Sequence, residues 1–330
     1  MAEWHGKRVF VTGAGGFIGS HLTEALALRG ADVTAMVHYN ALGSWGNLRF
    51  ADAELRKSLK VVSGDIQDAD FMYRALEGMD VVFHLGALIA IPFSYTAPRS
   101  YVRSNVEGTL NVLEATRRGL AGKMIHTSTS EVYGTALREP IDEEHPLQGQ
   151  SPYSASKIAA DKLAESYWRS FGTDVVTVRP FNTFGPRQSA RAFIPTIISQ
   201  ALSEPEIRLG ALDPQRDMTY VSDTVEGFIA AAATPNLAGD TINLGTGYTA
   251  SVGDFANRIL RLMNMDKPIV QDERRVRPAK SEVMKLVSDN RLAARKMGWS
   301  PKTDLDEGLR RTIDFVAANV EIFRSGDYNV

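Results

Sequence analysis

The glycine-rich stretch TGAGGFIGSHL, at positions 12–22, limits the possible folds of this chain more than any other feature. It comes directly after an apolar, β-branched run at 8–12 and leads into a helical pattern at 17–28. Gly13, Gly16 and Gly19 permit a tight turn, close approach of the backbone to a diphosphate, and close packing of a helix on a sheet. The first amides of the helix would then face the anion. A purely structural turn is the alternative, but a strand before the motif and a helix after it favour dinucleotide binding.

The remainder of the first half repeats this alternation of short apolar runs and longer amphipathic ones. Strands are expected at 8–12, 32–37, 59–63, 81–85, 123–126 and 175–179. Helices are expected at 17–28, 71–76 and 105–117. Strands that alternate with helices in this way indicate an α/β fold, namely a Rossmann-like, doubly wound parallel sheet.

After residue 179 the pattern changes to loops rich in glycine and proline, with shorter elements between them. Helices are expected there at 193–201, 221–232, 252–263 and 305–318. A strand-like run at 241–244 is expected to return to the first sheet. We therefore expect a dinucleotide-binding domain at 1–180, rejoined by about 221–247. The segments 181–220 and 248–330 would form a smaller α/β lobe that binds the substrate.

The composition excludes several classes of protein. A net charge of −2 over 330 residues, without interleaved basic and aromatic residues, argues against a nucleic-acid partner. No run of about 20 apolar residues could span a membrane, and the start, MAEWHGKRVFVTG, lacks the apolar region of a signal peptide. The absence of cysteine removes disulfides and thiolate chemistry, and the six histidines show no metal-binding spacing. We expect a cytoplasmic protein with a small-molecule ligand and no metal.

The residues after the second expected strand bear on the choice of dinucleotide. An acid about 20 residues beyond the glycines commonly holds the adenosine ribose, whereas this chain reads VHYN at 37–40. Without a carboxylate to repel a ribose 2′-phosphate, the sequence favours NADP over NAD, with His38 as a contact. The alternative is that His38 is a surface residue and that other groups hold NAD. Asp65 follows the third strand, where it would either hydrogen-bond the adenine amine or cap the next turn.

The stretch QSPYSASK places a tyrosine and a lysine on one helix. Ser151 is suited to cap a helix whose first residue is Pro152. Tyr153 then lies in the first turn, and Lys157 lies one turn later on the same face. A nearby ammonium, the positive end of the helix and an oxidised nicotinamide would all favour the phenolate form of the tyrosine. The alternative is an ordinary pair on the surface of a helix.

The stretch HTSTSEVYG follows the expected strand at 123–126 and contains a carboxylate, Glu131. A carboxylate at the end of a buried strand must be hydrated, paired or used in chemistry, because burying it without compensation is costly. Glu131 is therefore a candidate for a catalytic role. A glutamate held by structural hydrogen bonds is the alternative.

Seven motifs, in order along essentially the whole chain, resemble those of the extended short-chain dehydrogenase/reductases that act on nucleotide sugars. They are TGAGGFIGSHL, HLGA, STSEVYG, PYSASK, RPFNTFGPR, RDMTYVSD and RPAKSEV. The resemblance implies that Thr129, Tyr153 and Lys157 form the catalytic triad at the nicotinamide, with Thr129 hydrogen-bonded to the sugar hydroxyl that is oxidised.

The resemblance also implies which residues bind the two ligands. Those expected at the cofactor are Gly13, Gly16, Phe17, Ile18, Gly19, His38, Asp65, Ile66, Leu85, Tyr153 and Lys157. Those expected at the substrate are Asn182 and Arg187, near the sugar diphosphate, and Arg216 and Arg277, on its phosphates. For Arg277, in the charged stretch ERRVRPAK, a solvated face is the alternative.

In the sugar 4,6-dehydratases that the chain resembles, the glutamate of the STSEVYG motif acts as a general base. Oxidation of C4 acidifies the C5 proton, which Glu131 would remove; water would leave from C6, and the nicotinamide would return its hydride to C6. The dinucleotide would thus be tightly bound and recycled. Many dehydratases carry an aspartate before this glutamate, whereas this chain has Ser130, as in the enzymes of the GDP-mannose type. Either Glu131 serves both steps or Ser130 relays the proton.

Longer stretches resemble the dehydratases of the legionaminic acid pathway, which act on UDP- or GDP-linked N-acetylglucosamine. These stretches are ALIAIPFSYTAPRSYV, PLQGQSPYSASKIAADKLAESYWRSFGT and RPFNTFGPRQSARAFIPTIISQAL. A UDP-glucuronate decarboxylase, which also oxidises C4 first, and a nucleotide-sugar 4-epimerase remain alternatives. A nucleotide-sensing protein without chemistry is a further one, against which the intact Thr129, Tyr153 and Lys157 argue.

The helices at 99–117 and after Ser151 carry apolar residues on more than one face. The residues concerned are Val106, Leu110, Val112, Leu113, Ile158, Leu163 and Trp168. One face must cover the sheet, and the other could pack against a second copy of the chain. We expect a homodimer through a four-helix bundle, as in the family that the chain resembles; a thick core within one chain is the alternative.

Overall fold

The alternating pattern of the first half folds into one parallel sheet in the computed structural model, which describes residues 3–323. The strands are β1 (Arg8–Thr12), β2 (Asp32–His38), β3 (Lys60–Gly64), β4 (Met79–His84), β5 (Ala121–Thr127), β6 (Val175–Pro180) and β11 (Thr241–Leu244). Their order across the sheet is β11-β6-β5-β4-β1-β2-β3, and every neighbouring pair is parallel. The doubly wound α/β fold is confirmed, and the strand at 241–244 returns to the sheet as expected.

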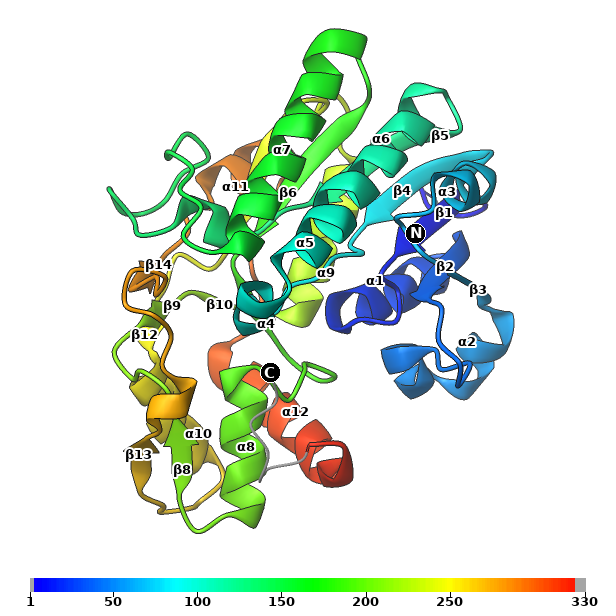
Figure 1. Cartoon of the computed structure of the whole chain (residues 1–330). Coiled ribbons are helices and arrows are strands. Elements are labelled where there is room, and N and C mark those ends of the chain that lie inside the picture. Colours follow the sequence, from blue (N-terminus) through cyan, green and yellow to red (C-terminus); the bar gives the residue numbers. More distant parts are fainter. Residues whose placement is uncertain (1–2, 324–330) are drawn as a thin grey trace.

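Helices cover both faces of this sheet (Figure 1). On one face α1 (Phe17–Leu28) packs against α9 (Val221–Ala233). On the other face α6 (Gly108–Arg117) packs between α3 (Ala69–Leu76) and α7 (Pro152–Phe171). A short helix, α2 (Ala53–Ser58), precedes β3. The three layers bury the apolar strands on both sides, which explains their nearly continuous apolar sequences.

The segment before α6 differs from the single helix expected at 105–117. It contains α4 (Ile91–Thr96), α5 (Pro98–Tyr101) and a π-helix, η2 (Val102–Glu107), which runs into α6. Asn105, inside the π-helix, is fully buried; its amide donates to the carbonyl of Leu88 at 2.9 Å and accepts from the Leu88 N–H at 2.8 Å. The wide turn therefore coincides with a buried side chain that ties the helix to the loop after β4, a contact that periodicity does not indicate.

The second lobe is built from short elements and lies at the carboxyl edge of the sheet (Figure 1). Its helices are α8 (Phe193–Ser203), α10 (Val252–Leu262) and α12 (Leu305–Ala318), whereas α11 (Arg291–Met297) contacts α9 and β11 of the large sheet. Its strands are β7 (Asn182–Phe184), β8 (Ile207–Leu209), β9 (Gln215–Arg216), β10 (Met218–Tyr220), β12 (Ala250–Ser251), β13 (Ile269–Gln271) and β14 (Lys285–Leu286). Helix α8 contacts both α10 and α12. A small α/β lobe is thus present beside the large sheet.

One continuous apolar core joins the two lobes. It includes Val11 from the sheet together with Phe184, Ile198 and Phe255 from the second lobe, all almost fully buried. A second cluster lies between the sheet and the helices α3 and α6. Within residues 3–323, none of the helices combines the length and the apolar character needed to cross a membrane.

The glycines of the first motif are required by close backbone contacts. Gly13 has φ +68°, and a Cβ there would lie 2.8 Å from the amide nitrogen of Gly86. A Cβ at Gly19 would lie 2.2 Å from the carbonyl oxygen of Gly13, so helix α1 can approach the turn only without a side chain. Gly16 caps α1 without a side-chain hydrogen bond, which leaves the first amides of the helix available to an anion.

We predict that Gly19→Ala lowers the free energy of unfolding by about 1–3 kcal/mol, because the new methyl group meets backbone that cannot move aside. The same change at Gly253 is a matched control, because Gly253 also lies in a helix and its Cβ would meet its nearest neighbour at an ordinary 3.6 Å. Urea denaturation of the two variants compares them. Equal stability of the two variants would mean that the contact with Gly13 does not constrain the motif.

Candidate active site

Helix α7 begins as the sequence predicts. Ser151 is its N-cap: the Ser151 hydroxyl accepts from the Ser154 N–H at 3.1 Å, and the Ser154 hydroxyl accepts from the Ser151 N–H at 2.9 Å. Pro152 occupies the first helical position. This reciprocal cap fixes where the helix starts and therefore where its first turn lies relative to the end of β5.

Tyr153 and Lys157 both point into the protein. Their exposed fractions are 7% and 4%, so an ordinary surface pair is excluded. The Lys157 ammonium donates to the carbonyl of Thr127, the last residue of β5, at 2.6 Å. The Tyr153 phenol hydrogen-bonds Thr129, which lies two residues after Thr127. The structure thus brings together the three residues of the expected triad.

The protein itself does not favour the phenolate form of Tyr153. Burial raises the pKa of the phenol, the hydrogen bond with Thr129 opposes this, and the charge of Glu131 adds to it. Burial lowers the pKa of Lys157 to about 8, against the attraction of the Asp161 carboxylate. Without the oxidised nicotinamide that the sequence argument also invokes, the side chains around Tyr153 therefore do not lower its pKa.

Glu131 lies in a short 3₁₀ turn, η3 (Ser130–Tyr133), directly after Thr129. The Thr129 hydroxyl accepts from the Glu131 N–H at 3.2 Å. The carboxylate is partly buried and lies near Tyr153, whose pKa it raises. Among residues 3–323 it has no hydrogen-bonding or ion-pair partner. The structural alternative, a glutamate held by side-chain hydrogen bonds, therefore finds no such bond in the described chain. Ser130, beside it, is 2% exposed.

The predicted cofactor residues gather at the carboxyl edge of the sheet. Leu85 follows β4 directly, and Ile66 follows β3 at 8% exposure with its carbonyl accepting from Asn111. Phe17 and Ile18 form the first turn of α1. Together with the narrow glycine turn and the uncapped helix, these residues fit a dinucleotide with its diphosphate at the start of α1.

The argument for NADP does not survive the structure. It assumed that no carboxylate lies near His38, but Asp65 Oδ2 lies 3.9 Å from His38 Nε2. His38 is paired with Gly64 in the parallel register of β2 and β3, which puts the next residue, Asp65, beside it. Asp65 also caps the following turn, where its Oδ1 accepts from the Gln67 N–H at 2.9 Å. A contact with adenine stays a prediction.

Two of the predicted phosphate-binding arginines converge. Arg216 donates to Glu282 Oε1 at 2.8 Å, and Arg277 Nη1 lies 3.6 Å from the same oxygen. Sequence reasoning missed Glu282, although it lies inside the RPAKSEV motif. Asn182, at the start of β7, has a buried Oδ1 without a hydrogen-bond partner among the described residues. These groups could bind a polar ligand, a role that stays a prediction.

Arg187 is turned away from these residues. Its guanidinium is paired with Glu24 of α1 and donates to the carbonyl of Phe50 at 3.1 Å. Its φ of +69° is unusual for a residue with a side chain, and its backbone carbonyl accepts from Asn47 at 3.0 Å. In this structure Arg187 joins the second lobe to the dinucleotide side of the first.

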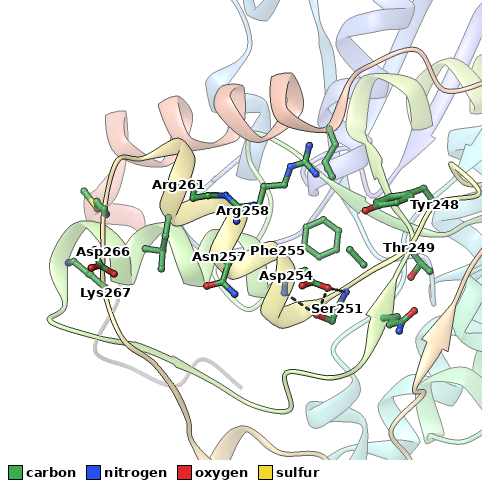
Figure 2. A pocket seen from close by; sticks show the side chains of 15 residues that line it. Tyr248, Thr249, Ser251, Asp254, Phe255, Asn257, Arg258, Arg261, Asp266 and Lys267 are labelled. Carbon is green, nitrogen blue, oxygen red and sulfur yellow. Dashed lines mark hydrogen bonds between the residues drawn. The ribbon is translucent and has the colours of Figure 1, made fainter.

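A hollow of about 620 Å³ lies outside this region, along α10 (Figure 2). Its lining includes Tyr248, Asp254, Arg258 and Arg261, and Arg258 is paired with Asp306 of α12. None of the residues that line this hollow belongs to the predicted catalytic, cofactor-binding or substrate-binding residues. The hollow is therefore separate from the candidate active site.

Comparisons with known proteins agree with this geometry. The family model described as GDP-mannose 4,6 dehydratase matches residues 10–312. The chain is 31% identical to the dTDP-glucose 4,6-dehydratase of an Actinoplanes species over 94% of this chain and 98% of that protein. It is 32% identical to the UDP-glucose 4-epimerase of Mycolicibacterium smegmatis over 93% of this chain and 98% of that protein.

A solved structure agrees as well. The dTDP-glucose 4,6-dehydratase DesIV from Streptomyces venezuelae, crystallised with NAD bound, superposes with a TM-score of 0.86 at 29% identity. The match covers 96% of this chain and 99% of that one. Similar proteins thus include both dehydratases and epimerases of nucleotide sugars, and the preference for NADP finds no support among them.

We predict that Tyr153→Phe abolishes reduction of the bound nicotinamide by a nucleotide sugar, with a loss of at least about 10²–10⁴-fold, because the proton acceptor at C4 is gone. Absorbance of the reduced nicotinamide follows the reaction. Tyr167→Phe, on the same helix, is the control, since it also removes a hydrogen-bonded phenol but one that meets Glu114. Near-normal turnover in Tyr153→Phe would remove this residue from the mechanism.

Proposed function

Because the chain belongs to the GDP-mannose 4,6-dehydratase family of extended short-chain dehydrogenase/reductases, we propose that it is a nucleotide-sugar 4,6-dehydratase in which Glu131 is the general base. The observation that carries the proposal is the partly buried Glu131 carboxylate, which lies next to Tyr153 and makes no ion pair within residues 3–323. A 4-epimerase inverts C4 without removing the C5 proton, so its reaction needs no base at C5. Epimerases among the similar proteins make that reaction the second candidate.

The proposed order of steps follows the resemblance to the sugar 4,6-dehydratases. Tyr153 takes the proton of the C4 hydroxyl while Thr129 hydrogen-bonds the same oxygen. When bound, the dinucleotide would supply the acceptor for the C4 hydride and the donor of the same hydride to C6. Between these events Glu131 removes the C5 proton, which the adjacent C4 ketone has acidified, and the C6 hydroxyl leaves as water. The product is a 4-keto-6-deoxy sugar, and a proton from the protein returns to C5.

The proton for the departing C6 hydroxyl comes from Glu131 in this proposal. Once Glu131 has taken the C5 proton it is a carboxylic acid at the right moment, so one residue serves both steps. Ser130 is the other candidate that the sequence left open, but it is 2% exposed, less accessible than its neighbour. We therefore assign the transfer to Glu131 and leave to Ser130 a relay at most.

The proposed substrate is UDP- or GDP-linked N-acetylglucosamine, on the strength of the longer stretches that resemble legionaminic acid pathway dehydratases. Arg216 and Arg277, which meet at Glu282, are suited to hold the diphosphate, and Asn182 offers an unused amide oxygen. A mass spectrum of the products from UDP-, GDP- and dTDP-sugars identifies the substrate. A product lighter by one water supports a dehydratase, an isomer supports an epimerase, and loss of carbon dioxide from UDP-glucuronate supports a decarboxylase.

The proposed cofactor is NAD, tightly bound and recycled. The Asp65 carboxylate beside His38 would repel the 2′-phosphate that distinguishes NADP. The Streptomyces venezuelae dehydratase, which has NAD bound, gives the same choice by similarity. Since each turnover returns its own hydride, no net reduced dinucleotide accumulates.

The proposed assembly is a homodimer through helices α6 and α7. These helices lie side by side on one face of the sheet (Figure 1). Of the residues considered from the sequence, Val112 and Leu113 are fully buried within one chain, whereas Val106, Leu110, Ile158, Leu163 and Trp168 are only partly covered. Val102, at the start of the segment that leads into α6, is 49% exposed. A four-helix bundle would cover this remaining apolar surface.

For the chemistry, we predict that Glu131→Gln uncouples oxidation from elimination. The isosteric amide cannot accept the C5 proton, so release of water should fall by about 10²–10⁴-fold while nicotinamide reduction persists and its absorbance builds up on the enzyme. In heavy water, wild-type product should carry deuterium at C5, and the variant should give almost none. Glu143→Gln is the matched control, because Glu143 is also partly buried and its Oε1 accepts from the Asn243 N–H, a bond that an amide oxygen can keep. Dehydration of Glu131→Gln at the wild-type rate would leave the epimerase as the better account.

For the assembly, we predict a dimer by light scattering at micromolar concentration, and a monomer for Val102→Glu with unchanged circular dichroism. The matched control is Leu28→Glu, which places the same charge at a 75% exposed leucine on the opposite face of the sheet and should stay dimeric. A wild-type monomer would refute this assembly.

A further inference from the structure

A buried group of polar side chains lies directly behind the turn that carries Glu131. Its centre is an ion pair between Asp161 of α7 and Arg179 of β6, whose side chains are 3% and 6% exposed. Arg179 donates to Asp161 Oδ2 through Nη2 at 2.9 Å and through Nε at 3.1 Å. None of the steps assigned above uses either residue.

The ion pair is hydrogen-bonded to the chain on both sides of Glu131. Before the turn, the Ser128 hydroxyl donates to Asp161 Oδ2 at 2.7 Å. After the turn, Arg179 Nη1 donates to the Tyr133 hydroxyl at 2.9 Å. Residues 128 to 133 therefore form a loop whose two ends are fixed to one buried ion pair. Thr129, Ser130 and Glu131 lie between the two fixed points.

The remaining contacts complete this arrangement. The Tyr133 hydroxyl donates to Asn243 Oδ1, in β11, at 2.8 Å. His126 Nε2 lies 3.0 Å from Asp161 Oδ1, the oxygen that Arg179 and Ser128 leave open, and burial lowers the pKa of this histidine. A neutral His126 donates its Nε2 proton there, because an ionised carboxylate can only accept. Both oxygens of Asp161 are thus used.

Stability alone is a poor explanation for this group. Burying an ion pair costs about as much in lost hydration as the attraction returns, and apolar residues of similar volume often serve as well. What a buried, fully hydrogen-bonded pair adds is a fixed direction for the groups that it contacts. The groups that this one contacts are the two ends of the η3 turn.

We propose that the Asp161–Arg179 pair, acting through Ser128 and Tyr133, is the positioning element that holds Glu131 at the distance from Tyr153 that proton removal from C5 requires. This inference rests on the proposed dehydratase function for its chemical consequence. The two steps of the reaction depend on the pair unequally. Tyr153 and Lys157 are placed by α7 and by the bond from Lys157 to Thr127, whereas Glu131 is placed by the turn.

Tyr133→Phe tests the proposal because it removes one of the two fixed points and keeps the ring. Since a displacement of about 1 Å can cost about 10²-fold in rate, we expect elimination in a single turnover to slow by about 10–100-fold, while C4 oxidation stays within about threefold. Ser128→Ala removes the other fixed point and should give the same pattern if Tyr133→Phe folds poorly. Tyr167→Phe, on α7 but bonded to Glu114, is the control and should leave both steps unchanged.

Hydrogen exchange gives a readout that does not need elimination. In Tyr133→Phe, a peptide that spans 128–134 should exchange faster while peptides from α7 keep the wild-type rate. Faster exchange in that peptide together with an equal loss in both chemical steps, or no change in exchange at all, would overturn the proposal. If the wild-type protein eliminates no water from any nucleotide sugar but the peptide still loosens selectively, the positioning stands and the dehydratase function fails.

Discussion

The hydrogen bond from the Lys157 ammonium to the Thr127 carbonyl, at 2.6 Å, is the contact on which the arrangement of the site depends. It joins the buried face of α7 to the last residue of β5. Because Tyr153 lies one turn before Lys157, the hydrogen bond of Lys157 also places the Tyr153 phenol beside the hydroxyl of Thr129 and near the carboxylate of Glu131. The Ser151 cap determines which turn of the helix occupies this place. A shift of either element by one residue would separate Tyr153 on the helix from Glu131 on the loop.

Burial sets the electrostatics of this contact. It raises the pKa of Tyr153 and lowers the pKa of Lys157 to about 8, so both groups resist carrying charge. By contrast, burial alone would raise the pKa of Asp161, but the hydrogen bond from His126 and the charge of Arg179 lower it to about 2. The site therefore combines Tyr153 and Lys157, whose charged forms burial disfavours, with the ionised Asp161–Arg179 pair behind them. This arrangement suits a reaction in which protons move at Tyr153 while the buried ion pair behind it keeps its charges and its position.

The sequence predicted the elements whose patterns are local. The segments β1, α1, β11 and α12 begin and end where expected, because their apolar periods and end signals are complete. The strands β9, β12 and β14 have two residues each and exist only through pairing between distant segments, which no period reveals.

The same distinction between local patterns and distant contacts holds in the site. A cap and a helical spacing predicted Tyr153 and Lys157, whereas the meeting of Arg216 with Glu282, 66 residues away, depends on the folded loops. Likewise, no sequence pattern predicts the positive φ of Arg187 or the pairing of its side chain with Glu24. The pairing of His38 with Gly64 could have been anticipated from a parallel β2–β3 register, and it would have placed the Asp65 carboxylate beside His38.

The central claim is that one hydride leaves C4 and arrives at C6 of the same sugar because Glu131 opens the path between them. The most direct test is to follow a deuterium label placed at C4 of the accepted nucleotide sugar through turnover by the wild-type protein. The account predicts a product lighter by one water, with the deuterium at C6. Deuterium that remains at C4 in a product of unchanged composition would contradict the account and identify a 4-epimerase.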